Sequence, residues 1–357
     1  MTLTIASSGA VAEVSAASFS GEIAALVAAF LWAAATLMFG RIGRQLAPVV
    51  LNLVKGAFAI AFILTTLLLR TNIPQLLSSL SLSDVVYLLL SGGIGIGLGD
   101  TAYFSAINSL GARRALLLEM LAPPTSAVLA WLFLDERLSL TAILGIGLTI
   151  TGITWVISER TAESTAIKQT RGQIKAGLKV SLIAVLCQAT GAVLSRGVLA
   201  STAIDPLFSA LLRLLAGMAF LGLLVSLRPR LLGDYGDGGS DRLYRADESD
   251  RADTFDTPMP ADIKRGWQTR WHTSLMALRE VNLLLAVAIA AFFGTYLGIW
   301  LQQIALKYAQ TGIAQALLAT SPLFVLPMAA TLGERISYRA ILGALISLAG
   351  VWVLLAS

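Results

Sequence analysis

Ten long apolar segments dominate this 357-residue chain and limit what it can fold into. A helix needs about 20 residues to cross ~30 Å of hydrocarbon, and each segment comes close to or exceeds that length. The segments lie at 22–40, 48–69, 84–107, 113–134, 139–158, 173–195, 206–227, 281–306, 312–333 and 338–356. They are continuously apolar and do not alternate, which excludes transmembrane strands. We therefore predict an all-α integral membrane protein that crosses the cell membrane many times.

Charged residues are too few to cover the surface of a soluble fold. They make up 13% of the chain, against about 25% in soluble domains, and 17 of them lie between positions 229 and 279. A single cysteine, Cys187, and a single histidine, His272, leave no disulfide framework and no zinc or histidine metal cluster. There is no GxxxxGK[ST] phosphate loop. We expect no cofactor, no metal and, because the basic residues lie between apolar segments, no nucleic-acid partner.

The chain also repeats itself. Residues 124–155 match residues 322–353 at a constant offset of 198, so that Glu-Arg-Leu-Ser at 136–139 falls on Glu-Arg-Ile-Ser at 334–337. Each copy holds five apolar segments, which is an odd number, so the second copy must enter the membrane upside down. Inverted repeats are typical of secondary transporters, whose solute binds near the membrane midplane between the copies.

The predicted fold is therefore ten transmembrane helices arranged as two inverted five-helix repeats. The first repeat covers 21–158 and follows a disordered tail at 1–20. A linker at 159–171 leads to the second repeat at 172–357, which a polar insertion interrupts at 229–279.

Several strings in these repeats resemble one known family. Each copy has a proline within its fourth segment and a corner of the form Asp135-Glu136-Arg137 or Gly333-Glu334-Arg335. With Leu31-Trp32-Ala33 and the Gly-Ala-x-Arg-Ala string at 111–115, these residues resemble the EamA family of the drug/metabolite transporter superfamily. The resemblance covers about residues 21–357, apart from the insertion. It implies a ten-helix carrier that imports or exports small organic solutes, without naming the solute.

Three ionisable side chains of the first repeat lie inside apolar segments: Lys55, Asp100 and Glu119. A charge within the membrane costs about 2.5–3.5 kcal/mol even on the lenient insertion scale, so partners or water are expected. The helical rise places all three about 9–12 Å deep from one side. Two interpretations stay open. The lysine and a carboxylate form a pair that fixes the packing of three helices, or one acid binds a transported proton, because one cation cannot neutralise both.

The second repeat offers one buried cation, Arg213, at the position that matches Lys55. The residues that match the two acids are Ile299 and Leu317, so the repeat offers this arginine no partner of its own. Its guanidinium fork suits a carboxylate or phosphate group of a solute. The alternative is an ion pair across the repeats with Asp100 or Glu119.

Other side chains in the segments are candidates for solute contacts, although each can equally join helices. The polar and aromatic candidates are Gln188, Tyr296, Gln302 and Gln303, with Trp32, Tyr103, Trp300, Gln315, Thr320 and Ser321 as weaker ones. Pro123, Pro124 and Pro322 interrupt the fourth and ninth segments, and we expect kinks there without solute contact. The alternative is that the carbonyls freed by the kinks line a cavity. Matching small residues, Gly145/Thr149/Gly152 and Gly343/Ser347/Gly350, predict close helix packing or a homodimer face.

The insertion combines an acidic stretch at 234–256 with apolar residues that recur at helical spacing between 263 and 278. The first part is predicted to be disordered. The second predicts an amphipathic helix in the lipid headgroup zone, with a plain linker as the alternative.

Two indications of the orientation in the membrane, the distribution of basic residues and the resemblance to a family, contradict each other. Loops on one side carry Arg41, Arg44, Arg113, Arg114, Arg160, Lys168, Arg171, Lys175, Lys179, Arg335 and Arg339, whereas the other side carries Arg70, Arg137, Arg196 and Lys307. The positive-inside rule places the first side in the cytoplasm and both termini outside, whereas the family that this sequence resembles implies termini inside. We favour the charge distribution.

The sequence therefore predicts a secondary transporter of a small organic metabolite, such as an amino acid, that works by alternating access. Whether proton movement drives this transport is left open by the sequence. The alternatives are a non-transporting membrane scaffold and an intramembrane enzyme, although no segment holds a Ser/His pair or a His/acid metal set. The expected partners are the solute, membrane lipid and, as an option, a second copy of the chain.

Overall fold

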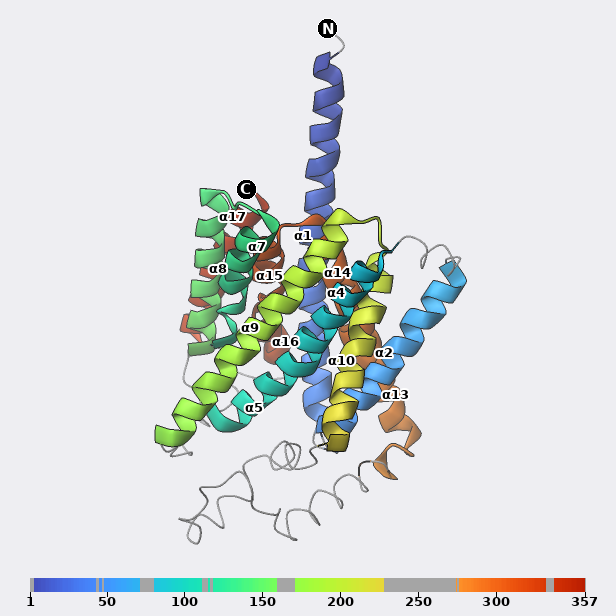
Figure 1. Ribbon diagram of the computed structural model, residues 1–357. Helices are drawn as coiled ribbons and strands as arrows, with labels where there is room; N and C mark the ends of the chain where they lie inside the picture. Colours follow the sequence, from blue (N-terminus) through green and yellow to red (C-terminus); the bar gives the residue numbers. More distant parts are fainter. Residues whose placement is uncertain are drawn as a thin grey trace.

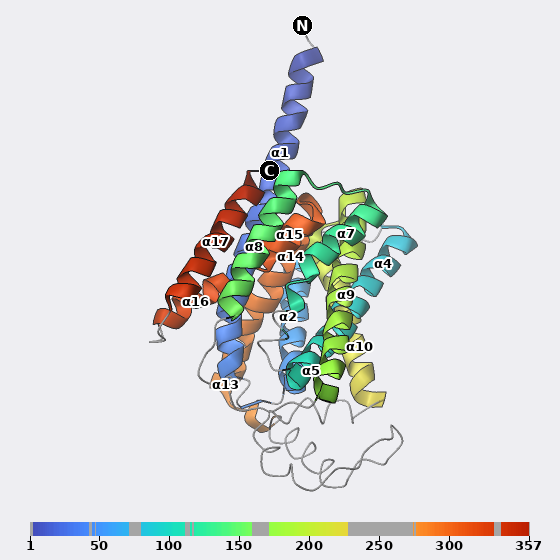
Figure 2. The same ribbon diagram turned by 90° about the vertical axis from the view of Figure 1, so that its left-hand side faces the viewer.

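A computed structural model describes residues 3–42, 45–46, 48–70, 80–110, 115, 118–158, 171–227, 274, 276–331 and 337–356. Every regular element in this part of the chain is a helix, and the helices pack side by side in one bundle (Figure 1; Figure 2). Seven of them are long and apolar enough to cross a membrane, and three shorter apolar helices lie at 122–134, 140–155 and 311–325. The prediction of an all-α fold is confirmed for the described residues.

The helices follow the predicted segments closely. In the first part of the chain they are α1 (Leu3–Ile42), α2 (Pro48–Arg70), α4 (Leu82–Gly92), the π-helix η1 (Gly93–Gly99), α5 (Asp100–Leu110), α7 (Ala122–Leu134) and α8 (Leu140–Ser158). In the second part they are α9 (Arg171–Ser201), α10 (Pro206–Leu227), α13 (Val281–Ala290), the π-helix η4 (Ala291–Leu297), α14 (Gly298–Tyr308), α15 (Thr311–Leu318), α16 (Ser321–Thr331) and α17 (Tyr338–Leu355).

The N-terminal prediction is wrong in one respect. The sequence predicts a disordered tail at 1–20, but from Leu3 onward these residues continue the first membrane helix, and α1 projects well beyond the rest of the bundle (Figure 1). Alanine, frequent in this stretch, is the best helix former. Extending an existing helix also avoids the cost of a new nucleus, which explains why a sequence without apolar periodicity becomes helical here.

The two ends of the bundle are distinguished below by the residues that lie there. At the Arg171 end, α1 and α10 end while α2 and α9 begin; at the Arg196 end, α2, α9 and α14 end while α10 and α15 begin. The first residues of α1 and the last residues of α17 both lie at the Arg196 end (Figure 1).

The predicted small-residue stripes pack against each other within the chain. A Cβ atom on Gly152 would lie 2.4 Å from the Ser347 backbone nitrogen, and one on Gly350 would lie 2.4 Å from the Thr149 nitrogen. The Ser347 hydroxyl donates a hydrogen bond to the Thr149 carbonyl over 3.1 Å. The stripes thus join α8 to α17, so close packing explains them and the homodimer face is not needed for them.

The fourth and ninth segments are interrupted where prolines were expected to act. A turn at 319–320 separates α15 from α16, and Pro322 lies in the first turn of α16. Pro123 likewise lies in the first turn of α7, followed by Pro124, after a turn at 120–121. A proline in a first turn removes a backbone N–H that has no partner within the helix. These residues therefore start new helices instead of bending continuous ones.

Two further predictions fall outside the described residues. The corner at 333–335 lies there, and so does almost all of the insertion, since residues 228–273 and 275 are not described. The amphipathic helix at 263–278 stays a prediction.

Candidate functional site

A cavity of about 280 Å³ lies among the helices that the buried charges occupy. The helices α1, α2, η1, α5, α9, α10, η4 and α14 all contribute side chains to its wall. Five of the main predicted site residues line it: Lys55, Asp100, Gln188, Arg213 and Gln302. The wall comes within about one helical turn of the last residue of α1 and the first of α2, through Phe39 and Asn52. The cavity therefore extends toward the Arg171 end from the middle of the bundle.

Both cations of the cavity lack an anionic partner among the described residues. Arg213 is 3% exposed, and its Nε and Nη1 atoms are buried with no hydrogen-bond partner. Lys55 has its Nζ atom 5.4 Å from the centre of the Phe39 ring, a cation–π contact. Neither forms an ion pair with a described residue within 4 Å, so the two predicted pairing alternatives are not realised in this conformation.

The one acid of the cavity, Asp100, is the first residue after the π-helix η1. Its Oδ1 atom accepts a hydrogen bond from Gln188 Nε2 over 3.4 Å. Lys55, Arg213 and Glu119 are all close enough to interact with it electrostatically. The cavity thus holds two cations and one acid, and these charges are not arranged in close pairs.

Small residues and π-helical geometry set the positions of these side chains. A Cβ atom on Gly92 would lie 2.5 Å from the Cα atom of Arg213, so only glycine lets α4 approach the backbone of α10 at this point. Three glycines of the following π-helix, Gly95, Gly97 and Gly99, pack against α9 or α10 as well, which agrees with the predicted role of this run in helix packing. Insertions of one π-helical turn are frequent at functional sites.

The second π-helix is held in the same way from the opposite wall. The Trp32 indole N–H donates a hydrogen bond to the Gly294 carbonyl over 2.8 Å, from α1 to η4. A Cβ atom on Gly298 would lie 2.3 Å from the Trp32 indole nitrogen. This tryptophan lines the cavity and at the same time fixes the spacing of α1 and η4.

Three of the main predicted site residues do not line the cavity. The Tyr296 hydroxyl forms a hydrogen bond of 2.8 Å with Thr66, and its ring packs against Phe62 and Phe292. Gln303 is fully buried, and its Oε1 atom accepts hydrogen bonds from two serine hydroxyls. Glu119 lies near Asp100 and Tyr103 but outside the wall. Tyr296 and Gln303 therefore join helices, which is the alternative role that the sequence left open for them.

Several wall residues escaped the sequence prediction. Thr36, Phe39, Asn52, Thr101 and Thr295 all line the cavity. Asn52 lies one turn before Lys55 on α2, and Thr101 directly follows Asp100. A search for polar residues on the same helical face as each buried charge could have found Asn52. Hydroxyls such as Thr36 carry no such signal, because their side chains commonly bond the preceding turn, as Thr36 does to the Trp32 carbonyl.

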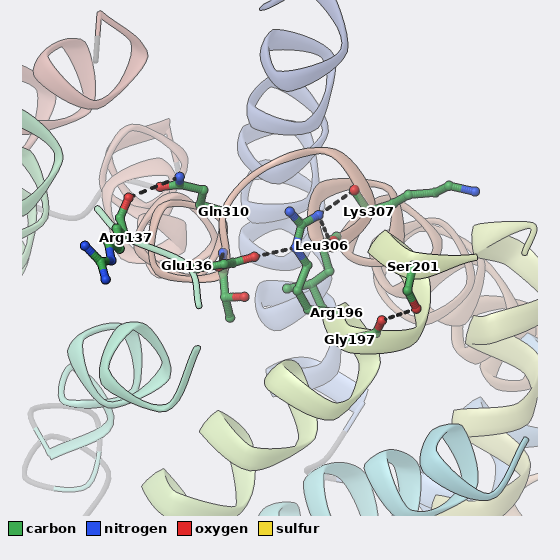
Figure 3. Close-up of polar contacts among 9 residues, drawn as sticks. Glu136, Arg137, Arg196, Gly197, Ser201, Leu306, Lys307 and Gln310 are labelled. Carbon is green, nitrogen blue, oxygen red and sulfur yellow. Dashed lines mark hydrogen bonds and ion pairs between the residues drawn. The ribbon is translucent and has the colours of Figure 1, made fainter. Parts of the chain in front are cut away.

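A second set of charges lies at the Arg196 end, about two helical turns beyond the cavity residue Gln188 on α9. The Arg196 Nε atom donates to Glu136 Oε1 over 2.6 Å, and both side chains are largely buried. The Arg196 Nη1 atom donates to the carbonyls of Leu306 and Lys307 at the end of α14, and the Thr311 backbone N–H donates to Glu136 Oε2 over 2.8 Å. Figure 3 shows Glu136 and Arg196 facing each other between the helices. We call these five residues the Arg196 cluster.

The local backbone explains how Glu136 reaches this position. Asp135 ends α7 in the left-handed region, with φ of 53°, and its N–H bonds the Ala130 carbonyl. Aspartate tolerates this conformation better than most residues other than glycine. The same corner is held from the other side by Gln310, whose Nε2 donates to the Arg137 carbonyl over 3.4 Å (Figure 3).

Comparisons with known proteins agree with this architecture. The helices define an integral membrane protein that crosses the membrane many times. The EamA-like transporter family matches residues 19–158 and 264–356, so the chain belongs to this family of membrane transporters. No curated protein matches the sequence. A solved structure titled "Crystal structure of protein" has a similar fold, with a TM-score of 0.63 and 15% sequence identity, and the match covers 94% of this chain and 96% of that one.

Proposed function

We propose that this protein is a secondary carrier that moves a small organic solute by alternating access, and that the cavity is its solute site. The observation that carries the proposal is Arg213, a buried guanidinium that lines the cavity with two nitrogens lacking a partner. An uncompensated buried charge costs several kcal/mol. A ligand that supplies the missing acceptors accounts for keeping it there.

The internal symmetry of the structure supports the predicted inverted repeats. The two π-helices start at Gly93 and Ala291, which are 198 positions apart, the offset that also relates the repeated strings. The small-residue stripes of α8 and α17 face each other across residues at the same offset, Thr149 and Ser347. We infer that the seven long and three shorter apolar helices form ten spans in two inverted five-helix units, with the cavity between them.

The charges of the cavity indicate the chemistry of the solute. Lys55 and Arg213 against Asp100 leave an excess of one positive charge, which a carboxylate or phosphate group would neutralise. Asp100 and the nearby Gln188 can in turn accept and donate hydrogen bonds to a polar or cationic group. A metabolite that carries an acidic group and a second polar group, such as an amino acid, satisfies both sides.

A transport assay separates this proposal from its alternatives. Purified protein is screened for thermal stabilisation by small organic acids, amino acids and phosphorylated metabolites, and the hits are tested for counterflow exchange in liposomes. The carrier proposal expects exchange of at least one stabilising solute. Stabilisation without exchange would point to a scaffold that binds a ligand, and chemical conversion of the solute would point to an enzyme.

A further inference from the structure

The Arg196 cluster joins the two halves of the molecule. Glu136 comes from the corner after α7, in the first repeat, whereas Arg196, Leu306, Lys307 and Thr311 all belong to the second. One carboxylate thus bonds a guanidinium with one oxygen and the first N–H of α15 with the other. A carboxylate is favoured at a helix N-terminus and a cation at a helix C-terminus. The contacts therefore hold the α7–α8 corner against the α14–α15 corner at this end.

Polar side chains lead from the cavity toward this cluster. Gln303 on α14, Ser195 on α9 and Ser209 on α10 are fully buried, and both serine hydroxyls donate to Gln303 Oε1, over 2.6 and 3.1 Å. The Gln303 Nε2 atom has no partner. A buried polar trio with an unsatisfied amide is costly in an apolar core. Packing alone therefore does not explain why these three polar side chains lie there.

The position of this trio along the helices is informative. Ser195 directly precedes Arg196 and lies two turns beyond the cavity residue Gln188 on α9. Ser209 lies one turn from the cavity residue Arg213, on the side toward the Arg196 end. The trio therefore occupies the space between the cavity and the cluster.

We propose that the Arg196 cluster is the closed gate of the solute pathway, and that the pathway reaches it from the cavity along Ser195, Ser209 and Gln303. The proposal rests on the carrier function, because alternating access needs an end that is closed in one state and open in the next. The exposed fractions of the Arg196 and Glu136 side chains, 13% and 12%, leave them close enough to water to separate and become hydrated. An ion pair in this setting can break and form again in each cycle.

Cysteine accessibility tests the gate in the full-length protein. A reporter cysteine at position 195 (Ser195→Cys) is made in a background without the native thiol (Cys187→Ala), and its reaction with a small water-soluble thiol reagent is timed. The closed gate should keep it unreactive. Glu136→Gln removes the charge that Arg196 binds, and the labelling rate should rise about tenfold or more, the factor expected when the closed state loses a charge-assisted hydrogen bond.

Arg137→Gln is the matched control, because Arg137 follows Glu136 directly and is exposed. Its contact with Gln310 is made by the backbone carbonyl, which the substitution keeps. This substitution should leave the labelling rate unchanged. Arg196→Lys is a second, milder opener that keeps the charge and loses the fork, so it covers the case in which Glu136→Gln does not fold. Folded variants of Glu136 or Arg196 that label no faster than the control would overturn the gate. Because labelling needs no solute, a failed counterflow assay would overturn the carrier without affecting this result.

Discussion

The two ends of the bundle use charged residues in opposite ways. Toward the Arg171 end, Lys55 and Arg213 line a cavity without an ion pair among the described residues. At the Arg196 end, hydrogen bonds of Arg196 and Glu136 join three helices, α9, α14 and α15, to the corner between α7 and α8. Leaving a cation unpaired inside a protein lowers stability, and pairing it at a helix junction stabilises one arrangement. This difference is what the proposed carrier requires, with a cavity that receives a ligand and a cluster that holds one conformation.

The largest effect is expected at the unpaired arginine. Arg213→Gln should lower solute affinity at least about thirtyfold, because losing one side of a buried charge contact costs about 2–5 kcal/mol. The affinity of Arg213→Lys should lie between that of the wild type and that of Arg213→Gln. Binding is measured by titration calorimetry with the solute from the screen. Arg70→Gln is the control, because Arg70 lies exposed at the end of α2, above the Trp300 ring. Unchanged affinity in a folded Arg213→Gln protein would remove this residue from the solute site.

The acids near the cavity can be tested for coupling. If Asp100 or Glu119 carries the transported proton, Asp100→Asn or Glu119→Gln should abolish proton-driven uphill uptake in liposomes and leave counterflow exchange. The reason is that exchange needs no net proton movement, whereas accumulation does. Uphill uptake at the wild-type rate in both variants would show that neither acid couples transport. Asp84→Asn, in the exposed capping box that begins α4, is the matched control.

A smaller effect, on stability, is expected where α8 packs against α17, away from both the cavity and the Arg196 cluster. Gly152→Ala places a Cβ atom 2.4 Å from the Ser347 nitrogen, and overpacking of this kind typically costs about 1–3 kcal/mol. Gly147, on the same helix, has no atom within 4 Å of an added Cβ. Thermal unfolding should therefore show a lower midpoint for Gly152→Ala and an unchanged one for Gly147→Ala. Equal midpoints would mean that the two helices are not packed as described.

The smallest effect concerns the wall of the cavity. Trp32→Phe keeps most of the ring and removes the hydrogen bond to the Gly294 carbonyl, which should cost about 0.5–1.5 kcal/mol of stability. Trp155→Phe, at an exposed position on α8, should cost less. Chemical denaturation in detergent compares the two. A larger loss at Trp155 would contradict the role given to the Trp32 indole.

Much of this architecture could be predicted because the membrane imposes it. The apolar segments match the observed helices, since a spanning helix must be long and apolar whatever its neighbours. The buried charges were also informative, because apolar surroundings make each one conspicuous, and Lys55, Asp100 and Arg213 all line the cavity.

The remaining features depend on tertiary contacts that the sequence does not encode locally. Arg196 counted only as a loop cation, and Glu136 is 60 positions away, so their pairing could not be read from spacing. Tyr296 and Gln303 resembled cavity residues but contact other helices, because the direction of each side chain depends on how its helix packs against its neighbours. Packing geometry of that kind has no simple sequence signal.

The central claim is that the Arg196 cluster closes the solute pathway at its own end. Under alternating access, solvent should then reach the cavity from the opposite, Arg171 end. The most direct test of this claim compares two single cysteines in the Cys187→Ala background: Asn52→Cys in the cavity wall and Ser209→Cys on the far side of Arg213. Both are exposed to the same small, water-soluble thiol reagent. The account predicts rapid labelling at position 52 and almost none at position 209. Labelling at position 209 as fast as at position 52, or an unreactive cysteine at position 52, would contradict it.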